Sequence, residues 1–151
     1  MVMPETDPDP VLEFLRLMWA VDHELHRVSK RMIGRLGLTA PQRLAVRFVG
    51  RQPGLTPGML AELLHLDRGT VTGIVQRLES AGLVSRARST GDTRRMHLTL
   101  TSKGHTLNRR RKGTVEAAVR RTLDGMPAAD LEAASRVLRR LAANLAVESR
   151  A

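Results

Sequence analysis

The feature that most constrains this chain is a pair of short helical segments separated by only three residues. Thr56-Pro57 is a capping residue followed by a proline at the first helical position, and it predicts a helix over 57–64. Asp67 is a typical N-cap for a second helix over about 68–81. Only His65-Leu66-Asp67 lies between the two. Two short helices joined by so tight a turn form a helix-turn-helix unit.

The second helix has two chemically different faces. With about 100° of rotation per residue, the apolar side chains fall on one face, which we predict to be buried. They are Val71, Ile74, Val75 and Leu78. The opposite face carries small residues and hydrogen-bonding side chains but no acid: Gly69, Thr72, Gly73, Gln76 and Arg77. The two glycines cost about 1 kcal/mol each in helix propensity relative to alanine. That cost is tolerable on a face whose backbone must approach a partner closely, although each could also be merely an exposed glycine.

A two-residue rhythm follows this helix. Met96, Leu98 and Leu100 alternate with polar residues and predict a half-buried strand, whose partner is the segment 84–88. The residues between them form a hairpin tip that contains glycine and is rich in arginine.

This tip is a candidate contact for an anionic partner. Arg88, Arg94 and Arg95 on a projecting loop can reach phosphates or the narrow minor groove of DNA. Asp92 stands two residues before Arg94 and can orient its guanidinium through a charge-assisted hydrogen bond. The alternative is a solvated turn in which Asp92 only shapes the loop.

Long helices are predicted at both ends of the chain, over 10–36 and, as two helices, over 103–124 and 128–147. The first begins at Asp9-Pro10, and its apolar residues are spaced 4, 3, 4, 3, 4 from Phe14 to Met32. This heptad spacing is typical of a seam between subunits, and it is equally compatible with a long amphipathic core helix. We expect the terminal helices to dimerise through Phe14, Met18, Val21, Leu131, Leu138, Leu141 and Leu145.

The positive charge of the chain is concentrated in its middle. The formal net charge is +10, yet residues 25–112 hold eighteen basic and four acidic side chains, a net charge of +14. Such a segment favours an anionic partner, either nucleic acid or a membrane surface. Two Phe, one Trp and no Tyr offer few stacking platforms for RNA, which favours double-stranded DNA.

Several functional classes are disfavoured. The chain has no cysteine, which excludes disulfides, thiolate metal sites and a cysteine nucleophile. It shows no glycine-rich phosphate loop, paired-carboxylate arrangement or His–Glu metal motif, so we expect neither an enzyme nor a cofactor. His23 and His26 are three residues apart, but we expect an Asp22–His26 pair rather than a metal site. Without a transmembrane run or a signal peptide, we expect a cytoplasmic protein with no membrane partner.

The sequence resembles the MarR family of bacterial transcription regulators over about residues 10–147. The resemblance is carried by LTPGMLAELLHLDRGTVTGIVQRLESAGLVSR, followed by GDTRRMHLTLTSKG. Its most specific elements are Leu78-Glu79-x-x-Gly82-Leu83-Val84, Asp92-x-Arg94-Arg95 and Leu100-Thr101-x-x-Gly104. The fold class that follows is mainly α, with about six helices and a two-stranded β-wing in one domain over 1–151. Residues 39–101 would form the winged helix-turn-helix, and 10–36 and 103–147 the dimerisation helices.

The resemblance implies a homodimer that binds a palindromic DNA operator, and members of this family are often released from DNA by a small-molecule effector. We expect the protein to repress its target genes, or less often to activate them. The resemblance also implies that Arg94 enters the minor groove and that Asp92 positions it. Arg68-Gly69 departs from the small hydroxyl residues of many relatives, which leaves the operator sequence open. The expected DNA-binding residues are Arg68, Gly69, Thr70, Thr72, Gln76, Arg77, Arg88, Asp92, Arg94 and Arg95.

Two points remain alternatives. Trp19 and His23 lie beside the heptad seam and are candidate effector-binding residues, with ordinary packing as the other role for the tryptophan. The other reading of the whole chain is a winged-helix module that binds nucleic acid or protein without sensing a ligand. A strong preference for double-stranded over single-stranded nucleic acid would distinguish DNA from RNA as the partner.

Overall fold

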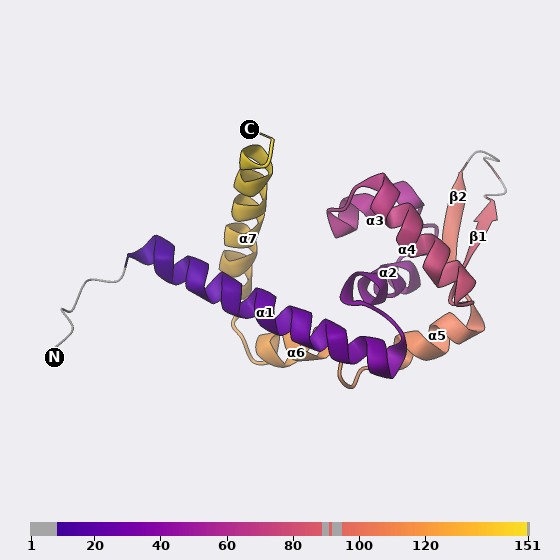
Figure 1. The fold of residues 1–151 in the computed structure, drawn as a ribbon, viewed down its shortest axis with the longest axis horizontal. Coiled ribbons are helices and arrows are strands. Elements are labelled where there is room, and N and C mark those ends of the chain that lie inside the picture. The colour runs from indigo at the N-terminus through magenta and orange to yellow at the C-terminus, as the bar shows by residue number, and fades with distance from the viewer. Residues whose placement is uncertain (1–8, 89–90, 92–94, 151) are drawn as a thin grey trace. The chain divides into compact units, whose positions relative to one another are not determined.

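The computed structural model describes residues 9–88, 91 and 95–150, and the chain forms two compact units, Met1–Val115 and Glu116–Ala151. The first unit contains α1 to α5 and both strands (Figure 1): α1 Pro10–Leu36, α2 Ala40–Arg51, α3 Pro57–Leu64, α4 Arg68–Ser80, β1 Val84–Arg88, β2 Met96–Leu100 and α5 Ser102–Arg109. Helix α6 (Val115–Leu123) begins at the boundary, and α7 (Ala128–Glu148) follows in the second unit. The extent of a single domain over 1–151 stays a prediction.

The predicted fold class is confirmed. The described residues form seven helices, one more than expected, and one antiparallel two-stranded sheet. The extra helix comes from the predicted segment 103–124, which was wrong as one helix. It is interrupted between α5 and α6, where Gly113 adopts a left-handed φ of 75° and Thr114 is buried and donates its hydroxyl to the Arg111 carbonyl at 2.7 Å.

Side-chain caps explain where the helices of the first unit begin. The Thr39 hydroxyl accepts from the Gln42 backbone N–H, and the Gln42 side chain accepts from the Thr39 N–H, which completes a capping box. The Thr56 hydroxyl accepts from the Met59 N–H and the Asp67 carboxylate from the Thr70 N–H, as their positions predicted. These caps fix both helices of the helix-turn-helix.

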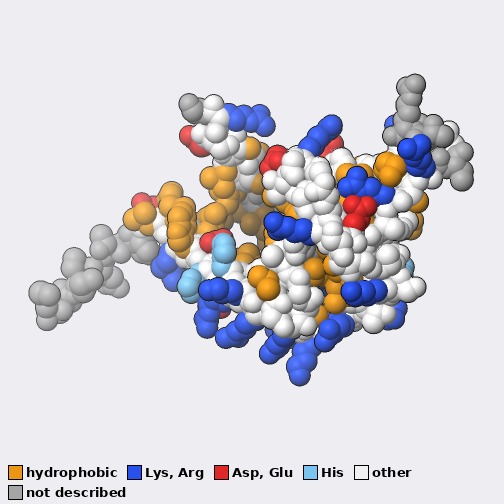
Figure 2. All heavy atoms as spheres, turned by 45° about the vertical axis from the view of Figure 1, so that its right-hand side comes forward, with side chains coloured by type: hydrophobic (Ala, Val, Ile, Leu, Met, Phe, Trp, Pro, Cys, Tyr) orange, Lys and Arg blue, Asp and Glu red, His pale blue; other side chains and the backbone are white. Residues whose placement is uncertain are grey.

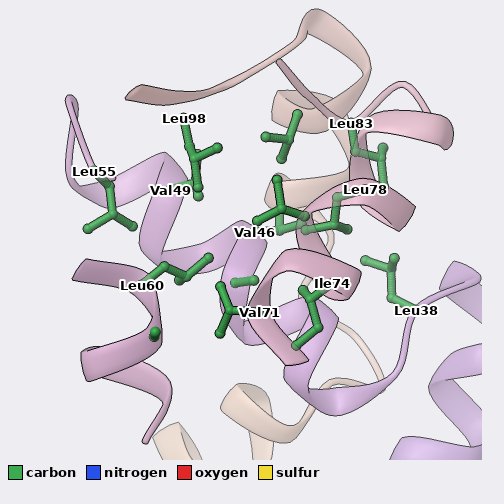
Figure 3. Close-up of a cluster of buried hydrophobic side chains, with 14 residues drawn as sticks. Leu38, Val46, Val49, Leu55, Leu60, Val71, Ile74, Leu78, Leu83 and Leu98 are labelled. Atoms are coloured by element: carbon green, nitrogen blue, oxygen red, sulfur yellow. The ribbon is translucent and has the colours of Figure 1, made fainter. Parts of the chain in front are cut away.

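A single core joins the helix-turn-helix to the hairpin. Figure 3 shows Val71, Ile74 and Leu78 of α4 directed toward residues of α2 and β2, such as Val46 and Leu98. All four apolar α4 residues predicted to be buried are buried. On α2, Ala45, Val46 and Val49 are buried, whereas Leu44 is exposed. Helix α2 contacts α3, α4, α5 and β2, so it is the central support of the unit.

Candidate nucleic-acid interface

Helix α4 presents its predicted outer face to solvent. Residues Arg68, Gly69, Thr70, Thr72, Gln76 and Arg77 are exposed, and Gly73 is half-buried. A methyl group added at Gly73 would meet no atom within 4 Å, so the helix backbone is open there to close approach. The only acid within α4 is Glu79, and its carboxylate pairs with Arg86 rather than facing outward alone.

Two hydroxyls on this face are already oriented by the helix. The Thr70 hydroxyl donates to Asp67 Oδ2 at 2.6 Å, and the Thr72 hydroxyl donates to the Arg68 carbonyl at 2.8 Å. The hydrogen bonds from the Thr70 side chain and backbone lower the pKa of the Asp67 carboxyl, because they stabilise its charged form. Since both hydroxyl protons are used internally, each oxygen can take part in a further hydrogen bond only as an acceptor.

The hairpin projects two of the predicted arginines. Strands β1 and β2 pair antiparallel, with Val84 opposite Leu100 and Arg88 opposite Met96. Arg88 and Arg95 are exposed where the two strands meet the tip. The predicted Asp92 and Arg94 lie outside the described residues, so their orienting contact stays a prediction.

Contacts that sequence reasoning missed hold this hairpin against the helix-turn-helix. On β1, Arg86 Nε lies 3.0 Å from Glu79 Oε1 at the end of α4. On β2, the Leu98 N–H donates to the Leu55 carbonyl at 2.8 Å, and His97 Nδ1 lies 2.6 Å from the Gly54 carbonyl oxygen. The period-two pattern predicted strand β2, but it carries no information about the residues outside the sheet that β2 contacts.

The Leu100-Thr101-x-x-Gly104 motif has a structural role. The Thr101 hydroxyl donates to the Gly82 carbonyl at 2.6 Å and accepts from the Gly104 N–H at 3.0 Å. A methyl group added at Gly104 would overlap the Leu83 carbonyl oxygen, so only glycine fits. The motif therefore joins the start of α5 to the turn between α4 and β1.

Arg43 is a second feature that sequence reasoning missed. Its side chain is only 1% exposed, and its guanidinium donates to the carbonyls of Leu107 (2.9 Å), Asn108 (3.3 Å) and Arg110 (2.6 Å). These groups belong to the last turn of α5 and the residue after it. Arg47 donates to the Asn108 side chain at 2.9 Å. The two arginines of α2 thus cap the C-terminal end of α5. The signal available in the sequence was that helical spacing places Arg43 next to the buried face of α2.

The predicted dimer residues are largely exposed within this single chain. Phe14, Val21, Leu131, Leu138 and Leu145 are between 39% and 61% exposed, and Met18 and Leu141 are half-buried. Within α1, described over its whole length, only Met32 is buried. In α7, which is also fully described, no residue is buried. Figure 2 shows hydrophobic side chains over the beginning of α1, next to the grey N-terminal segment.

The candidate effector residues are also on the surface: Trp19 is 67% exposed, and His23 is exposed. His26 Nδ1 lies 3.4 Å from Asp22 Oδ2, as predicted for this pair. Among the described residues, no group of three or more His, Asp or Glu side chains is placed to hold a metal ion. No helix in this described part is long and apolar enough to cross a membrane.

Comparison with known proteins identifies the family. The model of the MarR family matches residues 36–95. Over 125 residues the chain is 30% identical to an HTH-type transcriptional repressor of Mycobacterium tuberculosis, and the alignment covers 83% of this chain and 90% of that one. The chain belongs to the MarR family. The family predicted from the sequence motifs is confirmed, and it is a family of transcription regulators rather than enzymes.

Other comparisons agree on the family and the fold. The organic hydroperoxide resistance transcriptional regulator of Bacillus subtilis is 35% identical over 88 residues, which are 58% of this chain and 60% of that protein. The Streptococcus pneumoniae FabT structure in complex with DNA matches with a TM-score of 0.66 and 27% identity, covering 92% of this chain and 97% of that chain. The Mycobacterium tuberculosis repressor, solved with p-aminosalicylic acid, matches with a TM-score of 0.56 and 28% identity, covering 84% and 96%.

Proposed function

We propose that this chain is a homodimeric, sequence-specific regulator that binds double-stranded DNA and represses genes beside a palindromic operator. The observation that carries the proposal is the outer face of α4, which is exposed, open at Gly73 and lined by hydrogen-bonding side chains. An α-helix fits the major groove, where arginine pairs with guanine and glutamine with adenine. Arg77 and Gln76 are the side chains suited to those contacts.

The wing would supply the second contact. Arg88 and Arg95 are exposed at its base, and Arg94 with Asp92 completes the predicted groove contact. In Figure 2, Lys and Arg side chains predominate over Asp and Glu on the visible face, which agrees with the excess of positive charge in residues 25–112. A solved relative in complex with DNA supports the same kind of partner.

Dimerisation is proposed from the exposed apolar residues of α1 and α7. Large apolar side chains on two fully described helices with almost no buried residue indicate a protein interface. In a two-fold dimer each subunit contributes the same surface. Two recognition helices about 34–36 Å apart would then require an inverted repeat.

A small-molecule effector is proposed from the Mycobacterium tuberculosis relative, whose structure contains p-aminosalicylic acid. Trp19 is the only tryptophan, so its fluorescence reports on ligands that bind near the first part of α1. Because we propose chromosomal DNA as the partner, we also propose that the protein is cytoplasmic.

The direct test is selection of duplexes from a random-sequence library, followed by fluorescence anisotropy. Arg77→Ala should weaken binding of the selected duplex by about 1–3 kcal/mol, as expected for a base contact. Arg139→Ala, which removes an exposed arginine from α7, is the matched control and should bind like the wild type. Failure of the wild type to enrich any duplex would refute the proposed function. Equal losses in both variants would refute the assignment of α4 as the reading helix.

A further inference from the structure

The wing is attached to the helix-turn-helix at both of its strands, but the two attachments differ in strength. The Arg86–Glu79 pair on β1 joins side chains that are each 31% exposed, and exposed ion pairs stabilise little. On β2, His97 is half-buried and its Nδ1 lies 2.6 Å from the Gly54 carbonyl oxygen. The adjacent Leu98–Leu55 backbone hydrogen bond is 2.8 Å long. The attachment at β2 is therefore the firmer one.

The chemistry of this contact assigns the histidine tautomer. A carbonyl oxygen only accepts, so Nδ1 of His97 carries the proton and donates it. Gly54 suits this position because its φ of 81° lies in the left-handed region, and a Cβ there would lie 3.4 Å from the imidazole Nδ1, in ordinary van der Waals contact. A side chain at position 54 would be strained by its backbone and would touch the ring.

The contact joins the two parts that must meet DNA together. Gly54 lies two residues before Thr56, the N-cap of α3, and His97 lies two residues after Arg95. Two residues of strand span about 7 Å. The first turn of α3, Glu62, Arg95 and Met96 line one hollow, which places the wing base beside the start of the helix-turn-helix. A two-stranded hairpin is marginal by itself and depends on such contacts for a fixed orientation.

We propose that His97 is a positioning residue for DNA binding. Its hydrogen bond to Gly54 fixes the wing base against the start of α3, so that Arg88 and Arg95 meet the duplex in register with α4. The imidazole itself does not contact DNA. This inference rests on the proposed function, and it adds a residue that acts through the wing arginines.

The test compares two replacements of His97 on a duplex selected in vitro by the wild type. Asparagine places an amide nitrogen where Nδ1 lies and keeps the donor, whereas leucine fills a similar volume without a donor. His97→Leu should weaken binding about threefold to tenfold, because the wing must be ordered when it binds. His97→Asn should stay within about twofold of the wild type by the same reasoning. The control His105→Leu, at an exposed position of α5, should not change binding.

A double-mutant cycle with Arg95→Ala separates positioning from loss of stability. If His97 acts through the wing arginine, His97→Leu should weaken binding much less in the Arg95→Ala background than in the wild type. An equal loss in both backgrounds, together with a lower melting temperature, would overturn the inference. A loss in His97→Asn as large as in His97→Leu would also overturn it, because it would indicate a direct role of the imidazole.

The proposal remains testable if the leucine variant does not fold. His97→Ser then takes its place in the cycle, because a serine hydroxyl is too short to reach the Gly54 carbonyl. A selected duplex that His97→Leu binds as tightly as the wild type overturns this inference alone. Failure of the wild type to select any duplex refutes the proposed function, and the inference with it.

Discussion

Replacing Arg43 should destabilise the protein more than its distance from the proposed DNA surface suggests. The buried guanidinium satisfies three carbonyls at the end of α5, two of them at 2.9 Å or less. Hydrogen bonds to charged groups contribute about 1.5–3 kcal/mol each, and part of this gain offsets the cost of burying the charge. Arg43→Met keeps most of the packing volume but removes every donor. We expect it to lower the free energy of unfolding by about 3 kcal/mol.

Urea unfolding followed by circular dichroism measures this loss. With m between about 1 and 3 kcal/mol per molar, the midpoint should fall by about 1–3 M. Arg43→Lys keeps the charge but has no planar fork, so we expect about half the loss. Arg51→Met, at an exposed position of the same helix, should stay within about 0.5 kcal/mol. All variants are compared at one protein concentration, because dimerisation contributes to stability. A loss below about 0.5 kcal/mol in Arg43→Met would refute the reasoning.

Four further substitutions test other features of the structure. Gly104→Ala should prevent folding or strongly lower the urea midpoint, because its methyl overlaps a backbone carbonyl, and a wild-type midpoint would contradict this. Gly73→Ala should raise stability by up to about 1 kcal/mol yet weaken duplex binding measured by anisotropy; unchanged binding would argue against close approach of the backbone. Thr70→Val should return the lowered pKa of Asp67 toward its ordinary value in an NMR titration. Folding lowers this pKa, so the charged Asp67 cap stabilises the protein fully above the unfolded pKa, and this stabilisation is lost as the pH falls through the folded pKa. Because the folded pKa is higher in Thr70→Val, the variant should lose the stabilisation at a higher pH than the wild type. Leu138→Glu should abolish the proposed dimer in light scattering, because an unpaired carboxylate is costly to bury; a dimer that persists would exclude Leu138 from the interface.

Local sequence signals predicted most of the fold, because most of its elements are bounded by interactions between residues close together in the sequence. Thr39, Thr56 and Asp67 cap the helices that follow them, and their partners are three residues away. The buried face of α4 could be predicted from spacing alone, since the helix packs along one side. The start of α4 could be predicted from the Asp67 cap, which is the last residue of the three-residue turn after α3.

The missed features depend on residues far apart in the sequence. The break after α5 is stabilised by Arg43, whose carbonyl partners lie 64 to 67 residues later. Gly113 alone was a weak signal, because one glycine inside a helical pattern is tolerated. His97 likewise binds a carbonyl 43 residues earlier. A side chain that donates to a distant backbone carbonyl leaves no periodic pattern, so only the structure identifies it.

The residues that identify the family and the residues proposed to read DNA have different physical roles. Thr101 and Gly104, with the turn at Gly82-Leu83, form one connected set of hydrogen bonds and close contacts between α4, β1 and α5. These residues are required by the backbone arrangement whatever sequence is bound. The outer face of α4 contributes little to the core, so the packing of this unit does not determine which side chains it carries. The family motif therefore accounts for the position of α4, the proposed recognition helix, and the proposed operator must be determined by selection with this protein itself.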